Sequence, residues 1–314
     1  MPDVRVSVVV PALDAEATLE RCLAALSRQD VEGGFEVVVA DDGSSDRTVE
    51  IARAAGPLVR VVEGPPGGPA AARNRGVDAA RAPLVAFTDA DCFPAPGWLA
   101  AGVAALDSAD LVQGAVRADP EAERGPFDRT IEVGAERGLY ETANLFVRRE
   151  AFERAGGFED WLPAVRGKPL GEDVWLGWRV RRAGGRIAFS PEALVHHAVF
   201  RRRAAEFVAE RRRLVHFPAF ARQVPELRRV LFTARVFLSP RTAALDAALA
   251  GLAAAALVSP FALAALLPYA WTVARDAAPW RGQRLKAALV GVAADLAGLT
   301  ALLEGSVRFR SPVL

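Results

Sequence analysis

The stretch Glu36-Val-Val-Val-Ala-Asp-Asp-Gly-Ser-Ser-Asp46 carries the strongest indication of the fold. Its short β-branched run predicts a buried strand, and the acidic turn behind it predicts the end of that strand and the start of a helix. The same order recurs at Leu84–Thr88, which runs into Asp89-Ala-Asp91. Short strands that alternate with helical segments are typical of a mostly parallel sheet covered by helices, so we expect an α/β domain.

Further runs of the same two kinds follow along the chain as far as residue 200. We expect strands at Arg5–Val10, Glu36–Ala40, Val59–Val62, Leu84–Thr88, Leu111–Arg117 and Arg186–Phe189. We expect helices at Ala17–Gln29, Asp46–Ala55, Ala70–Ala80, Gly97–Leu106 and Glu172–Ala183. The polar segment Asp119–Gly138 has a weak pattern, which indicates a loop or a short helix. Residues 1–200 are therefore expected to form one domain.

Composition narrows the class of protein further. The chain has 314 residues, of which 52% are apolar, so a disordered or fibrous protein is excluded. A formal charge of +1 gives no global attraction to nucleic acid, and no nucleic-acid partner is expected. Cys22 and Cys92 lack the spacing of a disulfide scaffold or a zinc finger, which fits a reducing, cytosolic setting. The first apolar run, Val6–Val10, is too short for a signal peptide.

The last third of the chain has a different character. Residues 200–235 hold ten arginines against three glutamates, and residues 247–274 are 28 consecutive positions without a charge. We expect basic amphipathic juxtamembrane helices at 201–238, which would bind an anionic membrane surface. At 239–314 we expect apolar helices that either span the membrane or form a re-entrant hairpin with a break near Ser259-Pro260. A soluble helical subdomain is the alternative.

Acidic residues follow two strands of the expected sheet at the edge where ligands bind in such folds. Asp41 and Asp42 follow one strand, and Asp89 and Asp91 follow the other. Carboxylates brought together repel one another unless a cation compensates, so their convergence predicts Mg²⁺ or Mn²⁺ bridging to a nucleoside diphosphate. The alternatives are a helix N-cap for the first pair and a solvated turn for the second.

A glycine-rich loop, Gly64-Pro-Pro-Gly-Gly68, enters a helix that carries Arg73 and Asn74. Such a loop presents backbone amides to an anion, so we assign Arg73 and Asn74 to nucleotide-sugar binding. A loop without a ligand is the alternative.

Taken in order, these segments resemble glycosyltransferase family 2, the inverting nucleotide-sugar-dependent enzymes of GT-A fold. The resemblance covers roughly residues 5–200. The segments that carry it are Val6-Ser-Val-Val-Val-Pro11, Ala40-Asp-Asp-Gly-Ser-Ser-Asp46, Ala71-Ala-Arg-Asn-Arg-Gly76, Phe87-Thr-Asp-Ala-Asp91, Pro96-Gly-Trp-Leu99, Thr142-Ala-Asn-Leu145, Gly156-Gly-Phe158 and Gly171-Glu-Asp173. It implies a GT-A domain, related to the Rossmann fold, followed by a helical membrane-associated region.

For the donor, the resemblance implies contacts by four residues. Pro11 and Leu13 would lie along the nucleotide, and Asp42 would recognise its base. Asn144 would lie near the donor sugar or the acceptor, with burial among backbone partners as the alternative.

For the chemistry, the resemblance implies that Asp91 binds the metal and Asp89 contacts the ribose or a metal-bound water. Asp173 would be the general base, and Glu172 beside it would orient the acceptor. Two acids in the first turn of a helix also complement its dipole, which is the alternative interpretation. Of the pair His196-His197, we favour His196 as a third metal contact; a structural role is the alternative.

The sequence thus predicts an inverting glycosyltransferase at the cytoplasmic face of the membrane. It would move a sugar from a UDP- or GDP-sugar to a lipid-linked or membrane-proximal glycan acceptor, with Mg²⁺ or Mn²⁺. Two alternatives are a catalytically silent membrane scaffold and a sugar nucleotidyltransferase, although Pro11-Ala-Leu-Asp14 occupies the place of the latter's glycine-rich phosphate loop. A dinucleotide-dependent oxidoreductase is disfavoured because no Gly-x-Gly-x-x-Gly follows the first strand.

Overall fold

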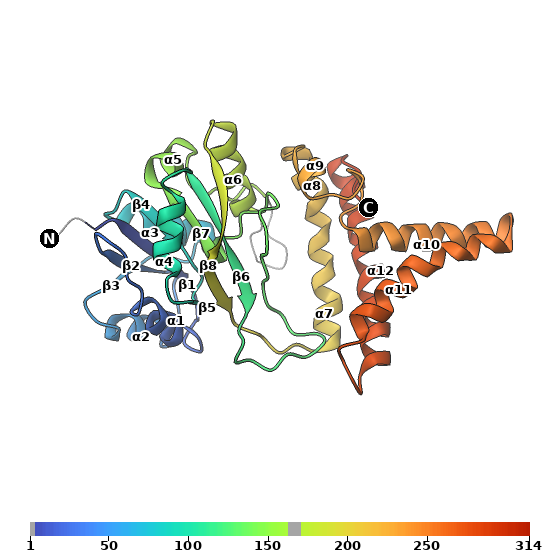
Figure 1. Cartoon of the computed structure of the whole chain (residues 1–314), viewed down its shortest axis with the longest axis horizontal. Helices are drawn as coiled ribbons and strands as arrows, with labels where there is room; N and C mark the ends of the chain where they lie inside the picture. The colour runs from blue at the N-terminus through green and yellow to red at the C-terminus, as the bar shows by residue number, and fades with distance from the viewer. Residues whose placement is uncertain (1–3, 163–170) are drawn as a thin grey trace. The chain divides into compact units, whose positions relative to one another are not determined.

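The chain divides into two compact units. The computed structural model describes residues 4–162 and 171–314 (Figure 1). The N-terminal unit comprises residues 1–123 and 130–199, and the C-terminal unit comprises residues 124–129 and 200–314. The segments 201–238 and 239–314, which we expected to be distinct regions, both lie in the C-terminal unit.

A mixed sheet forms the centre of the N-terminal unit. Its strands are β1 (Val6–Ala12), β2 (Phe35–Asp41), β3 (Val59–Glu63), β4 (Leu84–Phe87), β5 (Cys92–Pro94), β6 (Leu111–Ala118), β7 (Leu145–Arg148) and β8 (Ile187–His197). Their order across the sheet is β3-β2-β1-β4-β7-β6-β8-β5. The first four strands pair in parallel, whereas β7 is antiparallel to both of its neighbours.

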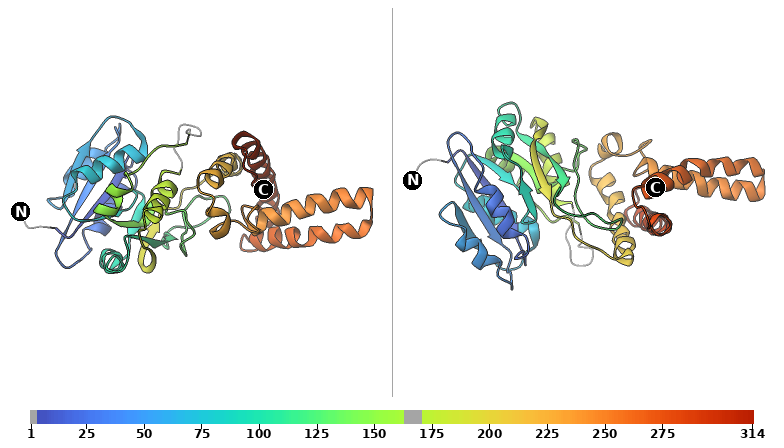
Figure 2. Two further views of the ribbon diagram at one scale, coloured as in Figure 1. Left: turned by 90° about the horizontal axis from the view of Figure 1, so that it is seen from above. Right: turned by 60° about the horizontal axis from the view of Figure 1, so that its bottom comes forward.

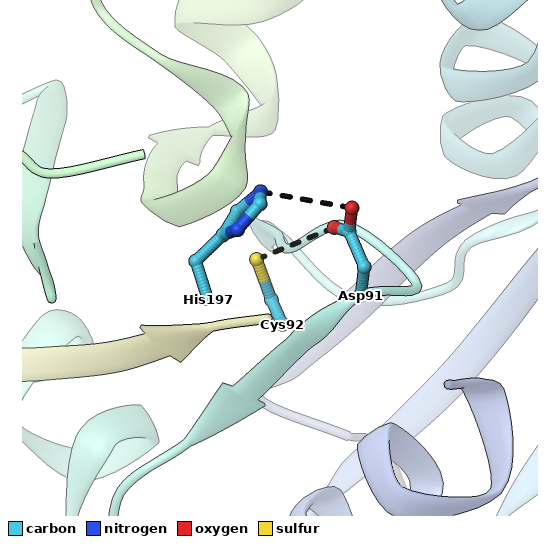
Figure 3. A group of neighbouring side chains, drawn as sticks. All are labelled: Asp91, Cys92 and His197. Atoms are coloured by element: carbon cyan, nitrogen blue, oxygen red, sulfur yellow. Dashed lines mark hydrogen bonds and ion pairs between the residues drawn. The ribbon is translucent and has the colours of Figure 1, made fainter. Parts of the chain in front are cut away.

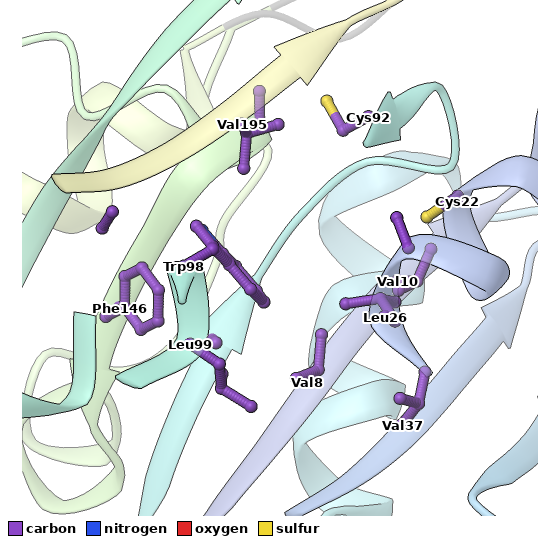
Figure 4. Close-up of a cluster of buried hydrophobic side chains, with 14 of the residues drawn as sticks. Val8, Val10, Cys22, Leu26, Val37, Cys92, Trp98, Leu99, Phe146 and Val195 are labelled. Carbon is purple, nitrogen blue, oxygen red and sulfur yellow. The ribbon is translucent and has the colours of Figure 1, made fainter. Parts of the chain in front are cut away.

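Helices cover both faces of this sheet (Figure 2). They are α1 (Leu19–Leu26), α2 (Thr48–Ala54), α3 (Gly68–Ala79), α4 (Trp98–Ala105), α5 (Arg149–Arg154) and α6 (Glu172–Arg182), with a 3₁₀ turn η1 (Thr142–Asn144). On one face, Leu26 and Trp98 pack with Val8 and Val37 in a fully buried core (Figure 4). On the other face α3 lies so close to β1 that a Cβ at Gly76 would collide with Val9. The expected α/β domain is confirmed.

The end of β8 differs from our expectation. We predicted that this strand would end at Phe189 and that Ser190-Pro191 would begin a turn. Instead the strand continues to His197, and its register against β6 shifts between Gly114 and Ala115. Proline cannot donate a ladder hydrogen bond, so it lies at the irregularity, and pairing resumes at Leu194. Ser190-Pro191, which we interpreted as a turn, therefore marks a bulge within one strand.

The C-terminal unit is helical. Its elements are α7 (Ala204–Glu210), η2 (Arg211–His216), α8 (Phe217–Gln223), α9 (Leu227–Val230), α10 (Pro240–Leu257), η3 (Pro260–Leu266), α11 (Leu267–Ala277) and α12 (Arg284–Phe309). Among the described helices, α12 alone is long and apolar enough, by length and composition, to cross a bilayer.

The basic segment at 201–238 contains the short elements α7, η2, α8 and α9. Several of its arginines bond within the unit. Arg202 pairs with Glu210, Arg222 donates to the carbonyl of Phe309, and Arg228 donates to the carbonyl of Pro312. Part of the basic charge is therefore engaged within the unit itself, in charge-assisted bonds to carbonyls and a carboxylate.

Candidate functional site

The carboxyl ends of β1, β2 and β4 meet at one edge of the sheet, as the acidic turns predicted. Ala12 is in register with Asp41, and the amide of Asp42 donates to the carbonyl of Ala12 at 2.8 Å. Pro11 is partly buried, and the side chain of Leu13 is 54% exposed just beyond the strand. The two residues assigned to the nucleotide thus lie beside the acidic turn that follows β2.

Asp42 holds the glycine-rich loop. Its buried carboxylate accepts hydrogen bonds from the amides of Gly67 at 3.0 Å and Gly68 at 2.8 Å. Arg75 of α3 adds a charged bond at 3.0 Å. These donors give Asp42 a structural role that local sequence patterns do not indicate, because the loop lies 25 residues away in the chain. Its contact with the base remains a prediction.

Arg73 joins two parts of the site that are distant in sequence. From α3 it donates to Asp89 behind β4 at 2.9 Å and to Glu172 in the first turn of α6 at 3.0 Å. The guanidinium is buried, which disfavours its charge, but Asp89 and Glu172 outweigh this and raise the pKa of Arg73. Both carboxylates bond to Arg73, so it holds them in place; its contact with the donor remains a prediction.

Asp173 has a different environment from its neighbour Glu172. It is partly buried in the first turn of α6, and its carboxylate accepts from the amide of Val174 at 2.7 Å. Burial, together with the negative charges of Glu172 and Glu141, raises the pKa of Asp173 well above its usual range. A carboxylate with a raised pKa is a stronger base, as a residue that takes a proton from a hydroxyl requires.

Asp91, Cys92 and His197 form a cluster at the far end of β8 (Figure 3). The Nε2 atom of His197 lies 3.6 Å from Oδ2 of Asp91, and Cys92 Sγ lies 3.9 Å from the other carboxylate oxygen. The Nδ1 atom of His197 lies 2.7 Å from the carbonyl of Ala198, to which it donates. In the neutral imidazole this bond leaves the Nε2 lone pair directed at the carboxylate, an arrangement that a cation between them would stabilise.

His197, and not the expected His196, is the histidine of this cluster. Successive residues of a strand point to opposite faces, so β8 can direct only one of the two toward Asp91. His197 is paired with Cys92 across β5 and β8, and its side chain is buried beside Asp91. Strand alternation would have identified it, had we expected β8 to extend this far.

The two asparagines assigned to the donor have protein partners; for Asn74, which is partly buried, the donor contact remains a prediction. Asn74 donates to the carbonyl of Phe158 and accepts from its amide, both at 2.9 Å. Asn144 is fully buried: it donates to the carbonyls of Ala115 and Ala193 and accepts from the Trp98 indole. Our expectation that Asn144 contacts the sugar is thus corrected, because its amide is already saturated by protein partners.

The Asn144→Leu variant should therefore lose stability rather than affinity. Removing the amide leaves two buried carbonyls and the Trp98 indole without partners, and each costs about 1–3 kcal/mol. We expect the free energy of unfolding, measured by urea titration, to fall by about 3 kcal/mol or more. Ser27→Ala, at an exposed hydroxyl, is the control. Unchanged stability with weakened donor binding would show instead that Asn144 contacts the sugar.

The fold and this edge define a class: a GT-A-like domain with acidic side chains at the carboxyl ends of its parallel strands. Residues 7–158 match the family model for glycosyl transferase family 2. Among curated proteins, the glycosyltransferase AglE of Haloferax volcanii is 32% identical over 207 residues, which cover 61% of this chain and 66% of that protein. The pre-mycofactocin glycosyltransferase of Mycobacterium tuberculosis is 30% identical over 211 residues, which cover 61% of this chain and 42% of that protein. Residues 7–158 thus form a domain of the glycosyl transferase family 2 type.

Solved structures show the same fold. The mannosyltransferase PcManGT from Pyrobaculum calidifontis, in complex with GDP-Man and Mn²⁺, aligns with 95% of this chain and 89% of its own at a TM-score of 0.58 and 23% identity. S. aureus TarS 1-349 in complex with UDP-GlcNAc aligns with 98% of this chain and 93% of its own at a TM-score of 0.53 and 18% identity. The aligned part thus spans less than two thirds of the two curated relatives but most of these two structures.

Proposed function

We propose that this protein is an inverting glycosyltransferase that moves a sugar from a UDP- or GDP-sugar to an acceptor hydroxyl in a single displacement. The observation that carries the proposal is the bridge made by Arg73, which bonds to Asp89 and Glu172 at once. It ties the acidic turn behind β4 to the first turn of α6, where Asp173 lies. The match to the family model and the donors bound by GT-A structures of the same fold support this donor class.

The cluster at Asp91 fits a divalent cation. A carboxylate oxygen and an imidazole nitrogen are ligands that suit Mn²⁺, and the carboxylate suits Mg²⁺ as well; the Cys92 sulfur is too soft for either ion. We assign Asp91 and His197 as ligands; Asp89, two residues before Asp91, pairs with Arg73 and remains a proposed further ligand. When bound, the cation would neutralise the negative charge that develops on the diphosphate leaving group.

Asp173 is the proposed base, and Glu172 is the positioning residue. Glu172 accepts a charged hydrogen bond from Arg73, so its carboxylate is already held by a guanidinium. Within residues 4–162 and 171–314, Asp173 has no such charged hydrogen bond, and its raised pKa favours proton uptake. It would take the proton from the acceptor hydroxyl as the oxygen attacks the anomeric carbon from the face opposite the diphosphate.

The acceptor is proposed to be lipid-linked or a membrane-proximal glycan, reached at the cytoplasmic face of the membrane. Exposed basic side chains support an anionic membrane surface as a partner: Arg203 is 85% exposed and Arg275 is 64% exposed. The apolar character of the C-terminal unit supports the same partner.

Calorimetric titration of the purified protein with UDP, GDP and their common sugar conjugates, each with and without Mn²⁺, tests the proposal. We expect metal-dependent binding of one nucleotide, because the carboxylates at this edge need a cation to accept a diphosphate. Absence of binding under every condition would contradict the proposal and favour a catalytically silent scaffold.

The two adjacent histidines provide a matched pair of variants. His197→Ala should weaken Mn²⁺-dependent donor binding by about tenfold or more, since even partners outside the first coordination shell change metal affinity by about 10–100-fold. His196→Ala, on the opposite face of β8, should leave it unchanged. Titration of each variant with donor and Mn²⁺ measures this. A larger loss of Mn²⁺-dependent binding in His196→Ala than in His197→Ala would indicate that His196 is the metal ligand.

A further inference from the structure

The uncharged stretch at residues 247–274 forms most of a helical hairpin. In both views of the C-terminal unit, α10 runs out and the chain returns alongside it through η3 and α11 (Figures 1 and 2). The chain turns at Val258–Ser259, where the Ser259 hydroxyl accepts from the amide of Phe261 and begins η3. The two arms pack closely, because a Cβ at Gly251 would lie 2.7 Å from the carbonyl oxygen of Ala262.

The tip of this hairpin presents a continuous apolar surface. Leu257 and Val258 are each 84% exposed, and Phe261 is 91% exposed. Leu267 and Trp271 extend the surface back along α11. Water-soluble proteins rarely leave a patch of this kind uncovered, so the hairpin needs a partner.

Charged side chains mark the base of the hairpin. Arg241 of α10 bonds to Asp295 of α12 at 2.9 Å and to Asp276 of α11 at 2.5 Å. The Tyr269 hydroxyl donates to Asp295 at 2.7 Å. This cluster ties both arms to α12. Further basic residues lie at and after the end of the second arm: Arg275, Arg281, Arg284 and Lys286.

The uncharged part of the first arm has the length of one membrane leaflet. The segment from Ala247 to Leu257 is helical, and at 1.5 Å per residue it measures about 16 Å. Half of the hydrocarbon core of a bilayer is about 15 Å thick. The apolar tip of the hairpin matches the hydrocarbon, and the exposed Trp271 nearer the base matches the interface. The basic residues at the base match anionic headgroups.

We propose that the hairpin α10–η3–α11 inserts into a single leaflet of an anionic bilayer and does not span it. Both arms then enter and leave on one side, with the base cluster at headgroup level. In this arrangement α12 is not a membrane span, because Asp295 in its middle belongs to that base cluster. The inference deepens the membrane partner in the proposed function and does not depend on sugar transfer.

A lipid partner fits this surface better than a second copy of the chain. Protein interfaces surround their apolar centre with a rim of polar residues and hydrogen bonds. Here residues 247–274 carry no charge on any face, and the charges begin only at the base. This change from an uncharged tip to a charged base matches the change from hydrocarbon to headgroups across a leaflet. An interface with a second copy of the chain would not confine the charges to the base.

A fluorophore at the tip tests the insertion depth. Phe261→Cys would be labelled with an environment-sensitive dye in the full-length protein; the natural thiols Cys22 and Cys92 are buried, so the unsubstituted chain is the labelling control. In vesicles containing anionic phosphatidylglycerol, we expect the dye to be quenched by lipids brominated deep in the acyl chain. We expect protection from aqueous quenchers added outside or trapped inside. A label at Arg281→Cys, beyond the base, should stay accessible from outside.

Three results would overturn the inference. Quenching of the Phe261→Cys label by the trapped reagent would mean that the hairpin spans the bilayer. Quenching from outside, with the protein bound to vesicles, would mean that it lies on the surface. Protection without any vesicle, accompanied by a dimeric mass in solution, would assign the surface to a second copy.

Flotation of the protein with the same vesicles gives a second measurement. The double change Leu257→Asp and Phe261→Asp should lower vesicle binding by about tenfold or more, because a carboxylate is costly in hydrocarbon. Val307→Asp is the matched control: Val307 is 81% exposed near the end of α12, away from the hairpin and its basic residues, and the change should have little effect. Equal effects of both changes would contradict the insertion. Mn²⁺-dependent nucleotide binding, measured on the same variants, reports separately on the proposed function.

Discussion

The Asp173→Asn variant is expected to lose sugar transfer by a factor of about 10²–10⁴, the usual contribution of a general base. The amide cannot take the proton from the acceptor hydroxyl, while the donor site at the other strand ends is left intact. Donor affinity, measured by calorimetry with Mn²⁺, should therefore stay within a few-fold of the original. Transfer is measured as release of the nucleoside diphosphate in the presence of acceptor.

The rate of sugar transfer by the unsubstituted protein should depend on pH through the protonation of Asp173. Burial, together with the charges of Glu172 and Glu141, raises the pKa of Asp173, so the base is protonated over a wider acidic range. Transfer should rise with pH through that raised pKa. The effect on stability has the opposite sign: above the unfolded pKa of about 3.9, ionising Asp173 costs more in the folded state, so its contribution to stability is lost as pH rises through the folded pKa.

The asparagine variant tests both statements at once. It should be at least as stable as the original at neutral pH and should lose this advantage below about pH 4, where the aspartate is protonated in both states. Glu159→Gln, at a carboxylate that pairs with Arg179 at the surface, is the control and should keep its activity. Near-normal transfer by Asp173→Asn would remove the residue from the mechanism.

The Asp91→Ala variant is expected to weaken metal-dependent donor binding by about a hundredfold or more. The carboxylate supplies the negative charge of the proposed site, whereas His197 supplies a neutral nitrogen, so its loss should exceed that of the imidazole. Calorimetric titration with UDP- and GDP-sugars, with and without Mn²⁺, measures the change. The difference between the two conditions should nearly vanish.

A matched control separates this effect from a general change of charge. Asp107→Ala removes a carboxylate whose side chain is 70% exposed and which lies 3.6 Å from Arg5. It should leave both donor affinity and its Mn²⁺ dependence unchanged. If Asp91→Ala behaved in the same way, Asp91 would not be a metal ligand, and the cluster with His197 would be structural.

Local patterns were sufficient to predict the parallel strands β1 to β4 and the edge of the sheet at which they end. The run Glu36–Ala40 has the pattern of a buried strand, and the acidic turn behind it ends that strand wherever the chain is placed. Parallel pairing of β1, β2 and β4 then brings their carboxyl ends together without any further information. The positions of Asp42, Asp89 and Asp91 follow from this local chemistry.

Roles that depend on a partner far along the chain could not be predicted in this way. Asn144 and Asn74 carry the polar groups of ligand contacts, but packing supplies each with protein partners. Arg73 has the charge to bind a phosphate, but two carboxylates from other elements occupy it. In each case the sequence shows which hydrogen-bonding groups exist, and tertiary contacts determine which of them remain available.

His196 and His197 show the same distinction between local sequence and tertiary contacts within a single strand. The order of residues places a histidine pair after the last strand signal of the domain, close to the acidic edge. Whether His196 or His197 turns toward Asp91 depends on the register shift at Gly114 and Ala115, because one residue of slip reverses every side chain of a strand. That register is set by pairing with β6, more than seventy residues earlier. The chemical groups of this protein are therefore fixed by local sequence, whereas long-range strand pairing and packing select which of them meet.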